Sequence, residues 1–131
     1  MTDYPLTIAA LLLALAVYVW AILSTGRARV RYKVEAPSCS GDPAFERAFR
    51  AQQNTVEQLV LFVPLLALAA MLWGDLPAAL FGLVWSLGRI LYVATYSADA
   101  KKRGPGFLLS AGLSVLVLAG LIVTLALRIA G

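Results

Sequence analysis

Four long apolar segments divide this chain, and they constrain its fold more than any other feature of the sequence. They run from about residue 5 to 25, 44 to 73, 77 to 97 and 105 to 130. A helix needs ~20 residues to cross the hydrocarbon core of a bilayer. Three segments meet that length outright, and the second meets it if its more polar first half is partly embedded. We therefore predict an all-α membrane protein, a four-transmembrane-helix bundle that forms a single domain over residues 1–131.

The composition supports lipid as the solvent of these segments. Hydrophobic residues make up 61% of the chain, and charged residues make up only 14%. An ordinary soluble protein carries roughly 25% charged residues. A soluble domain of this length leaves too much of its surface in water to hide so many apolar side chains. The sequence therefore indicates an integral, multi-pass membrane protein.

Histidine is absent and cysteine nearly so, although both residue types commonly take part in catalysis or metal binding. The chain has no histidine and one cysteine, Cys39. The absence of histidine removes the usual general base and any Ser-His-Asp triad, and a lone thiol makes neither an internal disulfide nor a metal site. We expect no metal, and any catalysis must depend on Arg, Lys, Tyr, Asp, Glu, Asn or Ser.

The basic residues lie in two places. One group stands between the first two apolar segments and the other between the last two: Arg27, Arg29, Arg31, Lys33, Arg47 and Arg50, then Lys101, Lys102 and Arg103. The positive-inside rule predicts that both groups lie in the cytoplasm and both termini outside. The source membrane stays open between a bacterial inner membrane and the endoplasmic reticulum. We expect these bases to face membrane lipid, and we expect no nucleic-acid partner.

Polar residues also recur at helical spacing inside the second and third segments. They form two stripes, Arg47, Arg50, Asn54 and Glu57, and Arg89, Tyr92, Tyr96, Asp99 and Arg103. Ionisable groups in a membrane span are costly unless they are paired or line a wet cavity. One interpretation is a structural network of ion pairs, Glu57 with Arg89 and Asp99 with Arg103. The other is a pocket for an anion, which the surplus of arginines over acids favours because guanidinium groups bind carboxylates bidentately.

The same residues carry a family resemblance. The segment FERAFRAQQNTVE (45–57) closely resembles the signature of the MAPEG family, the membrane-associated proteins of eicosanoid and glutathione metabolism. The segments GRARVRYKV (26–34), GRILY (88–92) and YSADAKKR (96–103) match further blocks of that family in the right order. The resemblance is greatest to the branch that contains type-2 microsomal glutathione transferase and leukotriene C synthase.

The resemblance implies a homotrimer that binds one glutathione in each interface between neighbouring subunits. The glutathione contacts that it implies are Arg29, Arg50, Gln52, Asn54, Glu57, Tyr92 and Tyr96. Arg103 is then the catalytic residue, because a guanidinium held against the glutathione sulfur stabilises the thiolate. That thiolate attacks a lipophilic electrophile or a hydroperoxide that arrives from the bilayer. In such an oligomer we expect Arg103 and the Arg50 set to come from different subunits.

Two positions depart from the family pattern. Gln58 stands where the family often has an aromatic residue directly after the glutamate. Val30 stands where leukotriene C synthase carries a second arginine that is proposed as a general acid. The departure at Gln58 affects one glutathione contact of the family, and the departure at Val30 favours a generic glutathione transferase over leukotriene synthesis.

Two alternatives remain open. The first is a MAPEG-like protein that binds lipid or glutathione without catalysis, although Arg50 and Arg103 argue against it. The second is a small four-helix multidrug transporter. Transporters of that kind place an essential acid within the first span, whereas this chain has no acidic residue in that span after Asp3.

Overall fold

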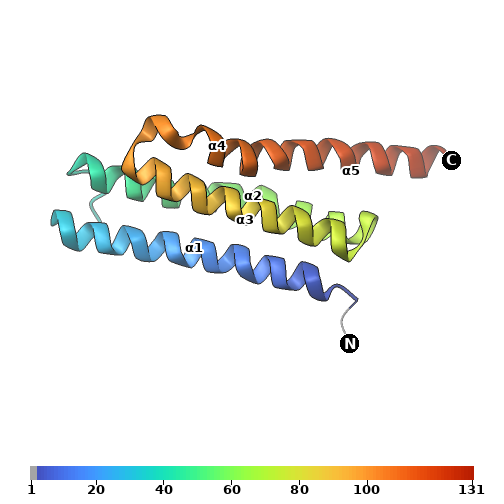
Figure 1. The fold of residues 1–131 in the computed structure, drawn as a ribbon, viewed down its shortest axis with the longest axis horizontal. Helices are drawn as coiled ribbons and strands as arrows, with labels where there is room; N and C mark the ends of the chain where they lie inside the picture. The colour runs from blue at the N-terminus through green and yellow to red at the C-terminus, as the bar shows by residue number, and fades with distance from the viewer. Residues whose placement is uncertain (1–2) are drawn as a thin grey trace.

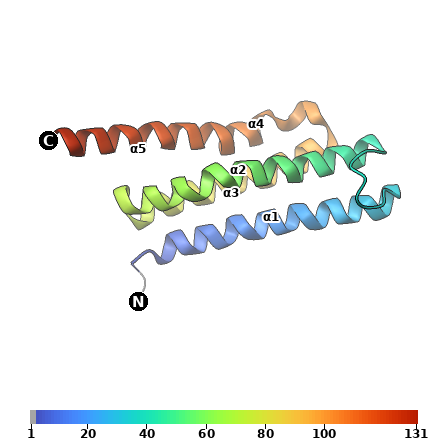
Figure 2. The same cartoon turned by 180° about the vertical axis from the view of Figure 1, so that it is seen from behind.

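Four long helical segments run side by side in the computed structural model, which describes residues 3–131. The first three are α1 (Pro5–Tyr32), α2 (Pro43–Trp73) and α3 (Asp75–Ala98). The fourth is composite and consists of η1 (Ala100–Arg103), α4 (Gly104–Phe107), η2 (Leu108–Gly112) and α5 (Leu113–Ala130). The first turn of α1 and the last turn of α5 lie at the same end of the bundle (Figures 1 and 2). The predicted all-α bundle with four membrane-spanning segments is confirmed.

Two boundaries differ from the sequence prediction. Helix α1 continues to Tyr32, so most of the first basic group is helical and does not form a loop. A tight turn over residues 74–77 is implied by the composition Gly-Asp-Leu-Pro, but Gly74 alone connects α2 to α3. Its φ of 97° is accessible to glycine without strain. The reversal is therefore one residue long, and α3 begins at Asp75.

Asp75, at the start of α3, holds the first turn of α1 beside this reversal. Its carboxylate accepts hydrogen bonds from the backbone N–H groups of Leu6, at 3.0 Å, and Thr7, at 2.7 Å. The Thr7 hydroxyl donates to the same carboxylate at 2.8 Å. The first N–H groups of a helix have no partner within the helix. Asp75 therefore serves as an N-terminal cap of α1 from a position 68 residues away in the chain.

The core lies between α1, α2 and α3. Phe62 of α2 stacks on Trp85 of α3 with 4.0 Å between ring centroids, and it also contacts Phe81 at 5.3 Å. Helix α1 presents small residues to this core, and a Cβ on Gly82 would lie 2.7 Å from the Cβ of Ala10. Small residues at such contacts let helix backbones approach closely in a membrane. Large aliphatic side chains on the outer faces of α1 and α5 are exposed, as expected for surfaces that contact lipid.

The composite helix packs against α2 and α3 and is irregular where it faces the basic end of the bundle. Gly106 and Gly88 bring its backbone against that of α3. A Cβ on Gly106 would lie 2.4 Å from the backbone nitrogen of Tyr92, and one on Gly88 would lie 2.8 Å from the Cβ of Leu109. Segment η2 is a single π turn, a widened turn that contains one extra residue. The close approach places Ser110 in the interior of the bundle.

Candidate functional site

Five of the eight predicted site residues line one cavity of about 350 Å³ at the basic end of the bundle. Helix α2 contributes Arg50 and Asn54, α3 contributes Tyr92 and Tyr96, and η1 contributes Arg103. Gly104 and Phe107 complete the lining. Residues from three separate elements thus meet in one place, as the two polar stripes of the sequence predict.

The backbone contact between α4 and α3 determines where Arg103 lies. Because Gly106 has no side chain, α4 rests directly on the backbone of α3 at Tyr92. Arg103 stands three residues before Gly106, at the end of η1, and is exposed at the cavity. A side chain at position 106 would push η1 and α4 away from α3. The position of Arg103 relative to Tyr92 therefore depends on this glycine.

Two tyrosines form one wall of the cavity. The rings of Tyr92 and Tyr96 stack with 5.4 Å between centroids and 10° between their planes. The guanidinium carbon of Arg89 lies 4.1 Å from the centroid of the Tyr92 ring. Tyr92 is buried, and Tyr96 is partly exposed. The stack holds both rings in a defined orientation, with a cation beneath the inner ring.

Arg89 is fully buried and donates to uncharged acceptors. Its Nη2 donates to Asn54 Oδ1 at 3.1 Å and to Thr55 Oγ1 at 2.7 Å, and its Nη1 donates to Ser110 Oγ at 3.3 Å. These partners come from α2 and from the π turn, so Arg89 connects three of the four spans. The bond to Oδ1 also directs the amide of Asn54. With its oxygen held by Arg89, the amide NH₂ remains as the group that can donate to a ligand.

The structural ion-pair network is the wrong interpretation of these stripes. Across residues 3–131, no ion pair joins Glu57 to Arg89 or Asp99 to Arg103. Glu57 is exposed, while the side chain of Asp99 accepts from the backbone N–H of Lys101 at 3.0 Å and so caps η1. The arginines at the cavity therefore face it without a carboxylate of the same stripe to neutralise them.

Three predicted glutathione contacts do not line this cavity in a single chain. Glu57 is exposed on α2, one turn beyond Asn54, and Gln52 is half-buried on the same helix. Arg29 holds the loop between α1 and α2, because its Nη1 donates to the carbonyl oxygen of Ser38 at 2.7 Å. Its guanidinium also lies 4.8 Å from the centroid of the Phe45 ring. The assignment of these three residues to a ligand stays a prediction.

One expectation concerns the assembly. The family resemblance implies that Arg103 and the Arg50 set come from different subunits, and that assignment stays a prediction. Within one chain, both residues line the same cavity. The connection between α3 and α4 is short and ordered as η1, which keeps Arg103 beside its own α2 and α3.

The sequence of this chain is similar to those of known proteins. The model of the MAPEG family matches residues 7–127. This chain belongs to the MAPEG family. Human microsomal glutathione S-transferase 2 is 48% identical over 99 residues, which cover 75% of this chain and 67% of that protein. An uncharacterised protein of the cyanobacterium Synechocystis is 41% identical over 127 residues, which cover 95% of this chain and 93% of that protein.

A third MAPEG relative is bovine leukotriene C4 synthase, which is 38% identical over 76 residues. The match covers 58% of this chain and about half, 51%, of that synthase. The MAPEG family to which this chain belongs therefore includes glutathione-dependent transferases. Membership of the family, together with four membrane-spanning helices, identifies an integral multi-pass membrane protein and argues against the transporter alternative.

Proposed function

We propose that this protein is a membrane-bound glutathione S-transferase that also reduces lipophilic hydroperoxides. The observation that carries the proposal is the cavity at the basic end, where two arginines, two stacked tyrosines and an oriented asparagine converge. Such a set of donors suits a small, polyanionic, peptide-like ligand. Glutathione has that chemistry, with two carboxylates, two amides, an ammonium group and a thiol.

The ligand chemistry assigns a role to each side chain of the cavity. Arg50 binds a carboxylate of glutathione through its planar pair of donors. The free NH₂ of Asn54 donates to a glutathione carbonyl, and the hydroxyl groups of Tyr92 and Tyr96 donate to a carboxylate while their rings pack on apolar neighbours. The cavity of one chain thus supplies anchors for the peptide part of the ligand.

A homotrimer would complete the site. Arg29, Gln52 and Glu57 lie outside the single-chain cavity, and we assign them to the interface at which a neighbouring subunit closes over glutathione. The carboxylate of Glu57 would bind the α-ammonium group, since no carboxylate is among the described residues that line the single-chain cavity. Gln52 would bind an amide, and Arg29 would bind the second carboxylate.

Arg103 activates the thiol. A free thiol has a pKa of about 8.5, so only a small fraction is thiolate at neutral pH. The guanidinium of Arg103 remains charged and favours the anion electrostatically. The thiol proton passes to water, and the sulfur then forms a bond to the electrophilic carbon while the leaving group departs with the bonding electrons.

With a hydroperoxide, the sulfur takes the terminal oxygen and releases the alcohol. A second glutathione then reduces the sulfenic acid to give glutathione disulfide and water.

The lipophilic substrate reaches this sulfur from the bilayer. Phe107 lines the cavity and is partly exposed, and the next residues of the composite helix present exposed Leu108 and Leu109. These apolar side chains continue the cavity toward the lipid-facing surface of the bundle. An electrophile dissolved in lipid can therefore approach Arg103 without crossing water.

A titration of the bound thiol tests the proposal. Purified protein with glutathione is titrated with base while the thiolate absorbance is followed, for the wild type, Arg103→Ala and Lys102→Ala. The variant Lys102→Ala is the matched control, because this substitution removes an exposed charge next to Arg103 that does not line the cavity. We expect a depressed thiol pKa in the wild type and in Lys102→Ala, and a return toward the free value in Arg103→Ala, with loss of conjugation to 1-chloro-2,4-dinitrobenzene.

The same titration separates catalysis from the non-catalytic alternative. Glutathione that binds the wild type with an unshifted thiol pKa and no turnover would identify a presenting protein. Undiminished conjugation by Arg103→Ala would refute the assigned mechanism. Absence of glutathione binding would refute the proposed function as a whole.

A further inference from the structure

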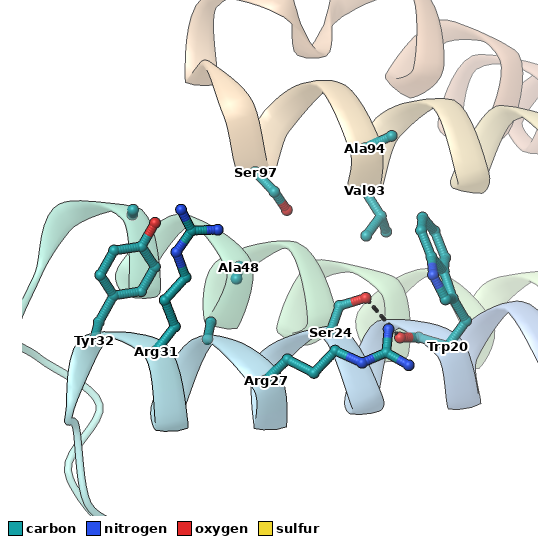
Figure 3. A pocket seen from close by; sticks show the side chains of 11 residues that line it. Trp20, Ser24, Arg27, Arg31, Tyr32, Ala48, Val93, Ala94 and Ser97 are labelled. Carbon is teal, nitrogen blue, oxygen red and sulfur yellow. Dashed lines mark hydrogen bonds between the residues drawn. The ribbon is translucent and has the colours of Figure 1, made fainter.

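A second cavity lies on the other side of α3 and shares no residue with the candidate glutathione site. It has a volume of about 290 Å³ and opens between α1, α2 and α3 (Figure 3). Its walls are Trp20, Ser24, Arg27, Ala28, Arg31 and Tyr32 from α1, Ala44 and Ala48 from α2, and Val93, Ala94 and Ser97 from α3. We name it the α1–α3 groove.

The polarity of the α1–α3 groove changes along its length. Arg31 and Tyr32 lie at the basic end of α1, whereas Trp20 and Val93 lie toward the middle of the bundle. Trp20 and Tyr32 are twelve residues apart, so the groove extends over about 18 Å of helix. Four of its lining residues are alanines, which leave the hollow between the helices unfilled. The side chain of Arg27 extends along α1 toward Ser24 and Trp20 (Figure 3), so positive charge stands at Arg31 and again nearer the middle of the groove.

The groove holds donors that the protein does not use itself. Arg27 and Arg31 are both exposed, and no acidic residue lines the groove beside them. The nearest interaction of Arg31 is with the ring of Tyr32, 5.5 Å from the guanidinium carbon to the centroid. Ser97 points from α3 into the groove, and its hydroxyl is buried without a hydrogen-bond partner among residues 3–131 (Figure 3). Buried hydroxyl groups are usually satisfied, so this one indicates a missing acceptor.

We propose that the α1–α3 groove binds an anionic phospholipid of the surrounding leaflet. Its phosphate oxygens accept from Arg27, Arg31 and Ser97, and the upper part of an acyl chain lies along Ala94 and Val93 as far as Trp20. Basic pockets between transmembrane helices bind anionic lipid headgroups in this way. The groove combines these donors with the apolar surface of Ala94, Val93 and Trp20, as a lipid with a charged headgroup and an acyl chain requires, whereas a soluble phosphate would have no use for the apolar surface.

Tryptophan quenching tests this proposal, because Trp20 lines the groove. The protein is reconstituted in phosphatidylcholine vesicles that contain dibrominated phosphatidylglycerol or, in parallel, dibrominated phosphatidylcholine. The signal of Trp73 and Trp85 is obtained from Trp20→Phe and subtracted. We expect Trp20 to be quenched several-fold more by the anionic lipid at low mole fraction, with saturation as the mole fraction rises.

Two variants and a control identify the groove as the cause. Arg27→Gln with Arg31→Gln removes the headgroup donors and should raise the half-saturating mole fraction at least tenfold, since each base near an anionic surface contributes about a factor of five. Ala94→Phe fills the space along the apolar surface without changing the charge and should also abolish the excess quenching. Lys101→Gln with Lys102→Gln removes as much charge from the same end of the bundle but outside the groove, and should leave quenching unchanged.

Several results would overturn the proposal. Equal quenching of Trp20 by both brominated lipids would show no preference for the anionic headgroup. An equal loss of quenching in the arginine and lysine pairs would mean that diffuse surface charge is sufficient. Relief of quenching by millimolar inorganic phosphate would make the groove a site for soluble anions. Circular dichroism of each variant establishes that the helices are intact, and Ala94→Phe keeps the test valid if the arginine pair does not fold.

Discussion

Replacing the buried Arg89 with methionine should weaken glutathione binding, while its opposing effects on stability should largely cancel. The stability cost follows from the partners that Arg89 leaves behind. The Thr55 hydroxyl also donates to the carbonyl oxygen of Ala51 at 2.8 Å, and the Ser110 hydroxyl donates to that of Gly106 at 2.8 Å. Both hydroxyl groups thus stay satisfied in the variant.

Only Asn54 Oδ1 is then left without a hydrogen-bond partner. An unsatisfied acceptor costs about 1–3 kcal/mol when it is buried, and this is an upper bound here because Asn54 is only partly buried. Removal of a buried cation that has no carboxylate partner returns a desolvation penalty of several kcal/mol. The two terms oppose each other, so we expect the free energy of unfolding of Arg89→Met to stay within about 2 kcal/mol of the wild type.

No opposing term offsets the effect of Arg89→Met on the free energy of glutathione binding. Without Arg89 the Asn54 amide is free to rotate, and Tyr92 loses the cation beneath its ring. Loss of one hydrogen bond to a charged or strongly polar ligand costs about 1.5–3 kcal/mol, and each 1.4 kcal/mol is about tenfold in Kd. We therefore expect the Kd for glutathione, measured by calorimetry in detergent, to rise about 10- to 100-fold in Arg89→Met.

A double-mutant cycle shows whether Arg89 acts through Asn54. If it does, Arg89→Met combined with Asn54→Ala should weaken glutathione binding little more than either change alone. Ser110→Ala is the matched control, since it removes a different partner of Arg89 and leaves Asn54 in place. A wild-type Kd in Arg89→Met, or fully additive losses in the double variant, would refute the positioning role.

Three further predictions concern the fold and the assembly. Asp75→Ala removes the cap from the first turn of α1, and should lower the free energy of unfolding by about 1–3 kcal/mol in a detergent unfolding titration; an unchanged midpoint would contradict the cap. Gly106→Ala should separate α4 from α3 and lower both stability and glutathione affinity, while Gly104→Ala, whose Cβ would meet nothing within 4 Å, should be close to neutral. Co-expression of Arg29→Ala and Arg103→Ala subunits should restore part of the conjugating activity that each lacks alone, because a mixed trimer contains some interfaces with both arginines intact; no recovery would place both residues in one subunit's site.

The positions of the spans could be predicted from hydropathy because lipid exposure requires continuous apolar sequence. The same local reasoning placed Arg50 with Asn54 on one helix face and Tyr92 with Tyr96 on another, since helical spacing determines which residues share a face. Arg103 could be added because it continues the stripe of α3. These predictions depend only on residues that are close in sequence.

Contacts between distant segments could not be predicted in this way. Asp75 looks like part of a turn in the sequence, and only the fold shows that it caps α1. Arg89 looks like one more member of a polar stripe, but its hydrogen bonds depend on Thr55 and Ser110, which no periodicity marks. The short connection through η1 decides that Arg103 meets Arg50 within one chain, and glycines at the crossing of α3 and α4 make that geometry possible. The sequence feature that marks the crossing of α3 and α4 is Gly106, which follows Pro105 directly.

The π turn at Leu108–Gly112 divides the last span into a half that lines the cavity, η1 and α4, and a half that packs in the core, α5. The extra residue in this turn offsets the faces of the helix before and after it by about 100°, the rotation of one residue in an α-helix. The half before the turn can therefore present Arg103 and Phe107 to the cavity, while Val117 and Leu121 of the half after the turn stay in the core. A one-residue deletion within this turn would leave Val117 and Leu121 in the core and rotate Arg103 and Phe107 away from the cavity.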